Sequence, residues 1–404
     1  MHARALLAAS AALALAAILS QQSLAADTLS AKAYRGLQQA QELLDAQQPD
    51  KAVAVLKNLA ATVEGQAYDY AMVMQYLAHS QMLADQPAAA LGTVTTALGR
   101  SDLPLELALE LMFYKAKLLL NDQRIEEGLG AIELYFSQSP EPKAEAFYYR
   151  GFALFHAGRF KEAQAALEQA VALAGRRIAP WDDLLLAAYV QGESWEKAAQ
   201  ALRLRVGRIP QVVQNWKQLA GVYYQQGDHA AALATLMLAQ RQHDLPPADL
   251  DTIIGLHGML GMPEKGARLL EAWLEGGKLE PTPQRVRRLA DMWLTARERT
   301  QAKQAFSRLA PEARTGETDA LLGQLHMEDA QWREAAAAFS RALAKGGLRE
   351  EPRTRLMLGV CHLKAGDTAR AVAALTEAAR SPTLRASAEH WLRSAAAQQA
   401  STIY

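Results

Sequence analysis

The sequence contains a single cysteine, Cys361, among its 404 residues, so the chain cannot form an internal disulfide. Aromatic residues make up only 7%, and neither charge sign is in excess, since 43 Lys and Arg balance 43 Asp and Glu. A chain without excess positive charge lacks the electrostatic footprint that nucleic acid or anionic lipid would attract. Half of the residues are hydrophobic and alanine is abundant, which favours closely packed helices stabilised by burial alone.

The first 25 residues form a separate segment. A short positive start, "MHAR", precedes an uncharged apolar run at residues 5–20 and small residues at Ser23 and Ala25. This pattern is typical of a secretory signal peptide, and the run is shorter than the ~20 residues of a membrane span. No cysteine follows the run, which excludes lipid attachment. We expect removal of residues 1–25 and export, into the periplasm if the cell is Gram-negative.

Motifs for catalysis and for metal or cofactor binding are absent. No two of the nine histidines lie three or four residues apart, so no helical metal pair exists. There is no phosphate-binding Gly-Lys-Ser/Thr loop, no dinucleotide fingerprint and no G-x-S-x-G motif. Cys361 and His362 are adjacent, and neighbours on a helix point in different directions. We predict no catalytic, metal-binding or cofactor-binding residues, no cofactor, and burial of Cys361.

The rest of the chain repeats a pair of amphipathic helices. Each unit holds two helix-length segments joined by turn chemistry such as "HAGRF", "QQGDH" or "KAGDT". The spacing is 33 to 38 residues, and 34 or 35 through the middle. Ten units begin near Ala33, Ala71, Leu109, Ala144, Ala179, Val213, Pro247, Pro283, Gly316 and Pro352.

Two columns define the repeat, because each keeps one side-chain size in all ten units. The twentieth place is always small: Ala52, Ala90, Gly128, Ala163, Ala198, Ala232, Gly266, Ala302, Ala335 and Ala371. The twenty-fourth place is always large and apolar: Leu56, Val94, Ile132, Leu167, Leu202, Leu236, Leu270, Phe306, Phe339 and Leu375. The eighth place is small in eight units. Small facing residues let two antiparallel helices approach closely, and a large residue one turn later fills the adjoining space.

This pattern resembles the tetratricopeptide repeat, in which an aromatic, Leu-Gly and Tyr precede Ala, a large residue and Ala. The best match reads Trp216, Leu219, Ala220, Tyr223, Ala232, Leu236 and Ala239. The resemblance implies an all-α fold, a right-handed α-solenoid of about ten hairpins over residues 26–382. Residues 383–404 are expected to form a capping helix and tail, with Trp391 covering the apolar end of the array. The first three units depart from the pattern, because they are longer or lack the glycine of the turn, and their boundaries are not fixed by the sequence.

The resemblance also implies that the first helices line a groove, through places 2, 5, 9, 12 and 13 of each unit. The candidate partner-binding residues at these places are Phe113, Lys117, Tyr148, Phe152, Phe155, Lys217, Tyr224 and Arg287. Tyr148, Phe152 and Phe155 follow an i, i+4, i+7 spacing that is usual for core, but Phe147, Gly151 and Leu154 already supply that helix with a core stripe. We therefore favour a binding patch.

Three classes of function are considered, and we predict the first, with the second as the alternative and no enzymatic activity. The first is a non-enzymatic exported scaffold that binds a peptide or protein partner in the groove, part of a cell-envelope machine. Here the chain resembles the repeat-only periplasmic protein that accompanies TonB–ExbB–ExbD energy-transduction systems. The second is a carbohydrate-handling subunit of exopolysaccharide secretion, which would need exposed Trp and Tyr platforms. The third, an enzyme, would need a perturbed acid or histidine cluster in a cleft.

The unit that begins at Pro247 contains four glycines, Gly255, Gly258, Gly261 and Gly266. Each glycine inside a helix costs up to ~1 kcal/mol relative to alanine. The unit is either a diverged repeat or a flexible joint within residues 247–282.

Overall fold

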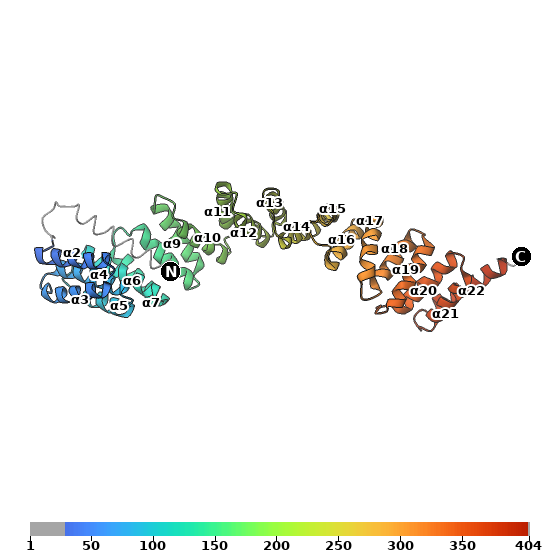
Figure 1. The fold of residues 1–404 in the computed structure, drawn as a ribbon, viewed down its shortest axis with the longest axis horizontal. Helices are drawn as coiled ribbons and strands as arrows, with labels where there is room; N and C mark the ends of the chain where they lie inside the picture. Colours follow the sequence, from blue (N-terminus) through green and yellow to red (C-terminus); the bar gives the residue numbers. More distant parts are fainter. Residues whose placement is uncertain (1–28, 403–404) are drawn as a thin grey trace. The chain divides into compact units, whose positions relative to one another are not determined.

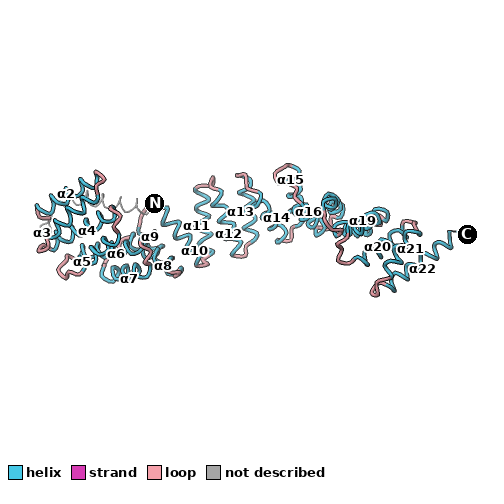
Figure 2. Tube along the Cα trace, turned by 60° about the horizontal axis from the view of Figure 1, so that its bottom comes forward, coloured by secondary structure: helices cyan, strands magenta, loops and turns pink. Residues whose placement is uncertain are grey.

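The computed structural model describes residues 29–402, and the predicted signal peptide at residues 1–25 lies outside this range. The described residues form 21 α-helices, one short 3-10 helix at Ala310–Glu312 and no β-strand. Figure 2 shows the helices alternating with short loops. The predicted all-α fold is confirmed.

The helices form ten hairpins and a final helix, α22. The hairpins of the first half are α2 (Ala31–Asp45) with α3 (Pro49–Thr62), α4 (Ala67–Leu83) with α5 (Pro87–Leu98), α6 (Leu105–Asn121) with α7 (Ile125–Gln138), α8 (Ala144–His156) with α9 (Phe160–Leu173), and α10 (Ala179–Gln191) with α11 (Trp195–Arg208). The others are α12 (Val213–Gln225) with α13 (His229–Gln242), α14 (Pro247–Met259) with α15 (Pro263–Glu275), α16 (Pro283–Thr295) with α17 (Arg299–Leu309), α18 (Glu317–Glu328) with α19 (Trp332–Lys345), and α20 (Glu351–Lys364) with α21 (Thr368–Ala379); α22 spans Arg385–Thr402.

The first four hairpins and α10 belong to one compact unit, and α12 to α22 belong to a second. The boundary between Ala201 and Leu202 falls inside α11. Within each unit, consecutive helices lie side by side, and each hairpin packs on the next (Figure 1). The final helix α22 packs on α21 and buries Ala388 and Ala395, while Trp391 lies against Leu363 and Ala371. Its partner surface is the last hairpin, which is the position expected for the capping helix.

The two columns read from the sequence form the core. All ten small residues of the twentieth place and all ten large residues of the twenty-fourth place are buried. Glycines at the eighth place show why size matters there. A Cβ at Gly151 would lie 2.5 Å from Leu167 Cγ, and one at Gly359 would lie 2.6 Å from Leu375 Cγ. In these two hairpins the large residue of the second helix thus occupies the space that the glycine of the first leaves empty, as the predicted pairing requires.

A third column, at the fifteenth place, is set by backbone conformation. This residue follows the first helix and has a positive φ in all ten hairpins: Gln47, Asp85, Gln123, Gly158, Glu193, Gly227, Gly261, Arg297, Ala330 and Gly366. In the α8–α9 hairpin, Gly158 N–H donates to Phe155 O at 3.0 Å, and Arg159 N–H donates to Leu154 O at 2.9 Å. These two bonds are the Schellman motif, which satisfies the last carbonyls of the helix and requires a left-handed residue between them.

The first three hairpins depart from the predicted unit starts. Their first helices α2, α4 and α6 begin two to four residues before Ala33, Ala71 and Leu109. The columns nevertheless keep their register, since the left-handed residue still falls at the fifteenth place. The wider spacing of these units therefore comes from N-terminal extension of the first helix, and α4 and α6 reach 17 residues each.

Candidate functional site

In the first compact unit, aromatic side chains link three consecutive first helices. Tyr148 of α8 stacks on Trp181 of α10, with ring centroids 5.0 Å apart and an interplanar angle of 10°. Tyr149 connects Tyr148 to Phe113 of α6 through edge contacts at 5.4 and 5.6 Å. Phe152 lies one turn after Tyr148, at 6.5 Å. We call Phe113, Tyr148, Phe152 and Trp181 the aromatic surface; each is half-buried.

The other two candidates in this unit are less accessible than the sequence suggested. Lys117 is only 8% exposed: its Nζ lies 4.7 Å from the centre of the Phe113 ring and 3.5 Å from Glu145 Oε1. Lys117 therefore packs against the aromatic surface, and its charge is not accessible to a partner in the groove. Phe155 is half-buried and packs edge-on against Phe160 of its own hairpin, at 5.4 Å. Phe155 therefore contributes mainly to the packing of α8 against α9, and we do not count it in the aromatic surface.

A histidine that the sequence did not single out lies near the same region. His79 of α4 is half-buried, and its pKa is lowered from the usual value of 6.5, first by burial and then by the positive charge of Lys117. Both effects disfavour the charged imidazolium. This side chain should therefore be neutral at neutral pH.

The candidates in the second compact unit are polar. Lys217 of α12 forms an ion pair with Asp249 of α14 at 2.9 Å. Tyr224 is 44% exposed, and its ring lies 4.9 Å from that of His229. These contacts join neighbouring helices but leave the Tyr224 ring open to a partner.

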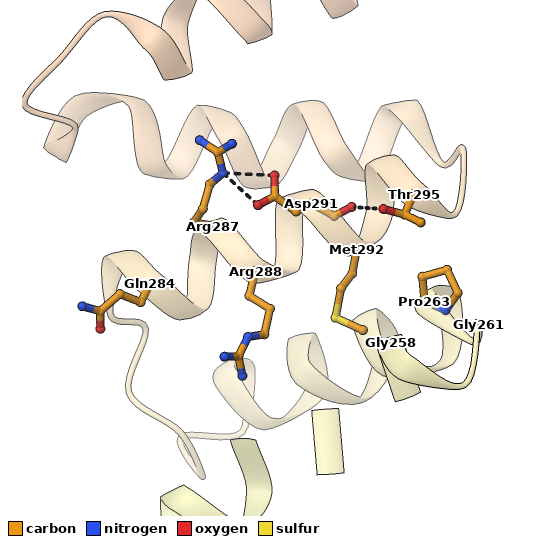
Figure 3. Close-up of a pocket in the computed structure, with 9 residues that line it drawn as sticks. All are labelled: Gly258, Gly261, Pro263, Gln284, Arg287, Arg288, Asp291, Met292 and Thr295. Carbon is orange, nitrogen blue, oxygen red and sulfur yellow. Dashed lines mark hydrogen bonds and ion pairs between the residues drawn. The ribbon is translucent and has the colours of Figure 1, made fainter. Parts of the chain in front are cut away.

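Arg287 belongs to a pocket between α14 and α16 (Figure 3). The pocket has a volume of about 430 Å³. It is lined by Gly258, Gly261, Pro263, Gln284, Arg287, Arg288, Asp291, Met292 and Thr295. From the sequence, the glycines indicate only a weakness of the unit. Gly258 occupies groove place twelve, and this position was the signal in the sequence for a hollow there.

Within residues 29–402, no group of three His, Cys, Asp or Glu side chains could hold a metal ion. Cys361 is buried among Ala335, Ala336 and Phe339, and burial raises the pKa of its thiol to about 12. A thiol with that pKa is a poor nucleophile at neutral pH. Its burial in the core was predicted and is confirmed.

Tryptophan exposure bears on the carbohydrate alternative. Trp216, Trp273 and Trp293 are buried, and the other four tryptophans are half-buried. None of the seven is therefore fully exposed, and Trp181, which belongs to the aromatic surface, is among the four half-buried ones. Among residues 29–402, no helix has both the length and the apolar character to cross a membrane.

Known proteins that are similar to this chain contain helical repeats. Residues 144–176 and 321–389 match models of the tetratricopeptide repeat family. No curated protein matches the chain. Among solved structures, that of Naa15/Naa10 bound to HypK-THB aligns over 76% of this chain at 15% identity, with a TM-score of 0.51. The alignment covers 52% of that protein, so this chain spans about half of its length.

Two smaller likenesses are to named repeat proteins. A tetratricopeptide repeat protein from Parabacteroides merdae aligns over 82% of this chain and 99% of its own, at 13% identity and a TM-score of 0.40. YrrB, described as a tetratricopeptide repeat protein with an unusual peptide-binding site, aligns over 44% and 89%, at 16% identity and a TM-score of 0.37. The two matched segments are thus similar to tetratricopeptide repeats, and the described residues outside them form sequential helix pairs as well.

Proposed function

We propose that the chain is a non-enzymatic scaffold that binds a protein or peptide partner through the groove places of its first helices. The observation that carries this proposal is the aromatic surface. Tyr148 contacts Phe152 and Trp181, and Tyr149 links it to Phe113, yet each of the four side chains of the aromatic surface keeps part of its area open. Rigid, half-buried aromatic residues are the residues that most often dominate binding energy, because they offer a large apolar area with little rotamer entropy to lose.

The surroundings of the aromatic surface support the same reading. Gln75 of α4 donates to Glu110 of α6 at 3.3 Å, and Lys117 reaches Glu145 of α8. These polar contacts hold successive first helices in register and place hydrogen-bonding groups near the apolar patch. An apolar centre with a polar rim is the usual composition of a specific protein interface.

We further propose export as the setting of this interaction. The signal sequence at residues 1–25 supports cleavage after Ala25 and, in a Gram-negative cell, a periplasmic location. The resemblance to the repeat-only protein of TonB–ExbB–ExbD systems supports an accessory role in envelope transport. Cell fractionation and N-terminal sequencing test the first point: a mature chain beginning at Ala26 is expected, and a cytoplasmic chain that retains Met1 would contradict it.

The binding proposal is tested by crosslinking the tagged full-length chain in its own cell and comparing captured proteins. Phe152→Ser should lower recovery of the partner several-fold while unfolding stays cooperative, since the side chain is half-buried. Leu134→Ser is the matched control, because Leu134 is 51% exposed on α7 and outside the aromatic surface. Equal recovery with Phe152→Ser and wild type would reject the proposal, as would equal losses in both variants.

A further inference from the structure

The wall that α14 contributes to the pocket between α14 and α16 is Gly258, which carries no side chain. A Cβ built at Gly258 would meet no atom within 4 Å. At the same place of its unit, α8 carries Phe155. No neighbouring side chain therefore takes the space beside Gly258, and Gly261 of the following turn and Pro263 at the start of α15 continue this wall (Figure 3).

Two arginines of α16 line the opposite wall, and their charges are incompletely matched. Arg287 donates from Nε to both carboxylate oxygens of Asp291, at 3.0 and 2.9 Å. Both bonds use Nε, so the two terminal nitrogens of this guanidinium keep donors for another group. The lining thus contains two guanidinium groups and one carboxylate, which leaves an excess of positive charge.

Arg288 makes only a long ion pair with the nearest other carboxylate, that of Asp251. Asp251 is bound mainly by Arg285, whose Nη2 lies 2.8 Å from Oδ2 and whose Nε reaches both oxygens at 3.2 and 3.3 Å. Arg288 approaches the same carboxylate only to 3.7 Å and is 47% exposed; its Nη1 also donates to the backbone O of Asp251 at 3.4 Å, a contact that does not compensate the charge. The guanidinium of Arg288 is thus the least compensated charge at the pocket.

We propose that this pocket binds one carboxylate, the side chain of a glutamate or aspartate in an extended segment of the partner, with Arg288 as its ion-pair partner. Guanidinium groups suit carboxylates because their donors match both oxygens. The remaining wall, formed by Gly258, Pro263 and Met292, offers apolar contact for the methylene stem of such a side chain. This inference rests on the proposed function and adds the chemistry of one anchor.

The test uses the purified full-length chain and two probes that differ only in charge, N-acetyl-glutamate methylamide and N-acetyl-glutamine methylamide. Binding is followed by the NMR signals of the arginine Nε–H groups. The glutamate probe should shift the Arg288 and Arg287 signals saturably, with an apparent affinity ~tenfold or more above that of the glutamine probe. Equal responses to the two probes, no saturable response, or a response to inorganic phosphate alone would overturn the proposal.

Two variants locate the site, each with a matched control. Gly258→Leu should fill the pocket without disturbing the core, and Arg288→Gln removes the charge; each should weaken the glutamate probe by ~tenfold. Gly221→Leu, at an open exposed site on α12, and Arg268→Gln, in an exposed pair with Glu264, should leave it unchanged. Retained binding in Gly258→Leu would reject the pocket as the site. Since these probes need no partner, the outcome is independent of the Phe152→Ser capture experiment.

Discussion

The close approach of α18 and α19 predicts that one substitution, glycine to alanine, has different effects at two places. Gly323 of α18 is buried, and a Cβ there would lie 2.8 Å from Cδ1 and Cε1 of Phe339 and 2.9 Å from its Cγ. Phe339 is itself fully buried, and an aromatic ring cannot bend away from one face. Gly255 of α14 is also helical, but a Cβ there would meet no atom within 4 Å.

The two variants share one energy term and differ in another. Alanine gains up to ~1 kcal/mol over glycine inside a helix, at either position. Overpacking a filled core costs about 1–3 kcal/mol, and it applies only to Gly323→Ala. We expect Gly255→Ala to stabilise by up to ~1 kcal/mol and Gly323→Ala to lie about 1–3 kcal/mol below it. The difference between the variants isolates the contact with Phe339.

Urea unfolding combined with hydrogen exchange measures this difference, because repeat proteins open locally and one global midpoint can hide a local loss. Amides of α18 and α19 should exchange faster in Gly323→Ala, while those of α14 and α15 should slow in Gly255→Ala. Adding Phe339→Leu to Gly323→Ala should recover part of the loss, since a smaller, flexible side chain can move. If Gly323→Ala proves as stable as Gly255→Ala, the close approach of α18 and α19 is refuted.

Two further predictions concern the turns and pH. Ala330 has a φ of 56°, and non-glycine residues pay ~1–2 kcal/mol in this conformation, so Ala330→Gly should raise the free energy of unfolding by up to ~1 kcal/mol in urea titrations; a decrease would contradict the assigned turn. Burial and the charge of Lys117 lower the pKa of His79 in the folded chain. Below pH 6.5, the usual pKa of histidine, the unfolded chain therefore binds more protons than the folded one. The contribution of His79 to the free energy of unfolding is complete above pH 6.5 and is lost as the pH falls through the folded pKa. Exchange in α4, corrected for intrinsic rates, should be faster at pH 5.5 than at 7.5 and lose this dependence in His79→Gln; an unchanged dependence would assign the effect to another group.

The core was predictable from the sequence because ten units report on the same geometry. A single small residue followed by a large one at i+4 means little, but the columns through Ala232 and Leu236 repeat without exception. Helix starts were less predictable in the first units. α4 and α6 begin after Gln66 and Pro104, and neither residue makes a side-chain capping bond. The missing cap is not the reason, since α8 and α12 begin at the predicted Ala144 and Val213 without one. The two core columns lie further along the unit and do not report an extra turn at the start of the first helix.

The left-handed column was present in the sequence but obscured. Only four units carry glycine at the fifteenth place; the others carry residues such as Glu193 and Arg297, which sequence reasoning takes as ordinary polar loop residues. Lys117 shows a different limit. The repeat template assigned Lys117 to a groove place, but it could not show that Phe113 and Tyr149 cover the side chain. The place of a residue on its helix follows from the period of the repeat, whereas the exposure of its side chain depends on the size of the side chains packed around it.

The same distinction explains why the glycine-rich unit was read as a weakness. Gly266 lies at the twentieth place, where a Cβ would collide with His257 and Met292, so this glycine is required by packing. Gly258 lies at a groove place, where no neighbour fills the volume, so the same residue type produces a pocket. Core places must be small for the hairpin to close, but groove places are free to vary without loss of fold. Glycine at a groove place therefore costs helix stability and improves no core contact. Space for a ligand group is the functional gain that would explain why this cost is tolerated.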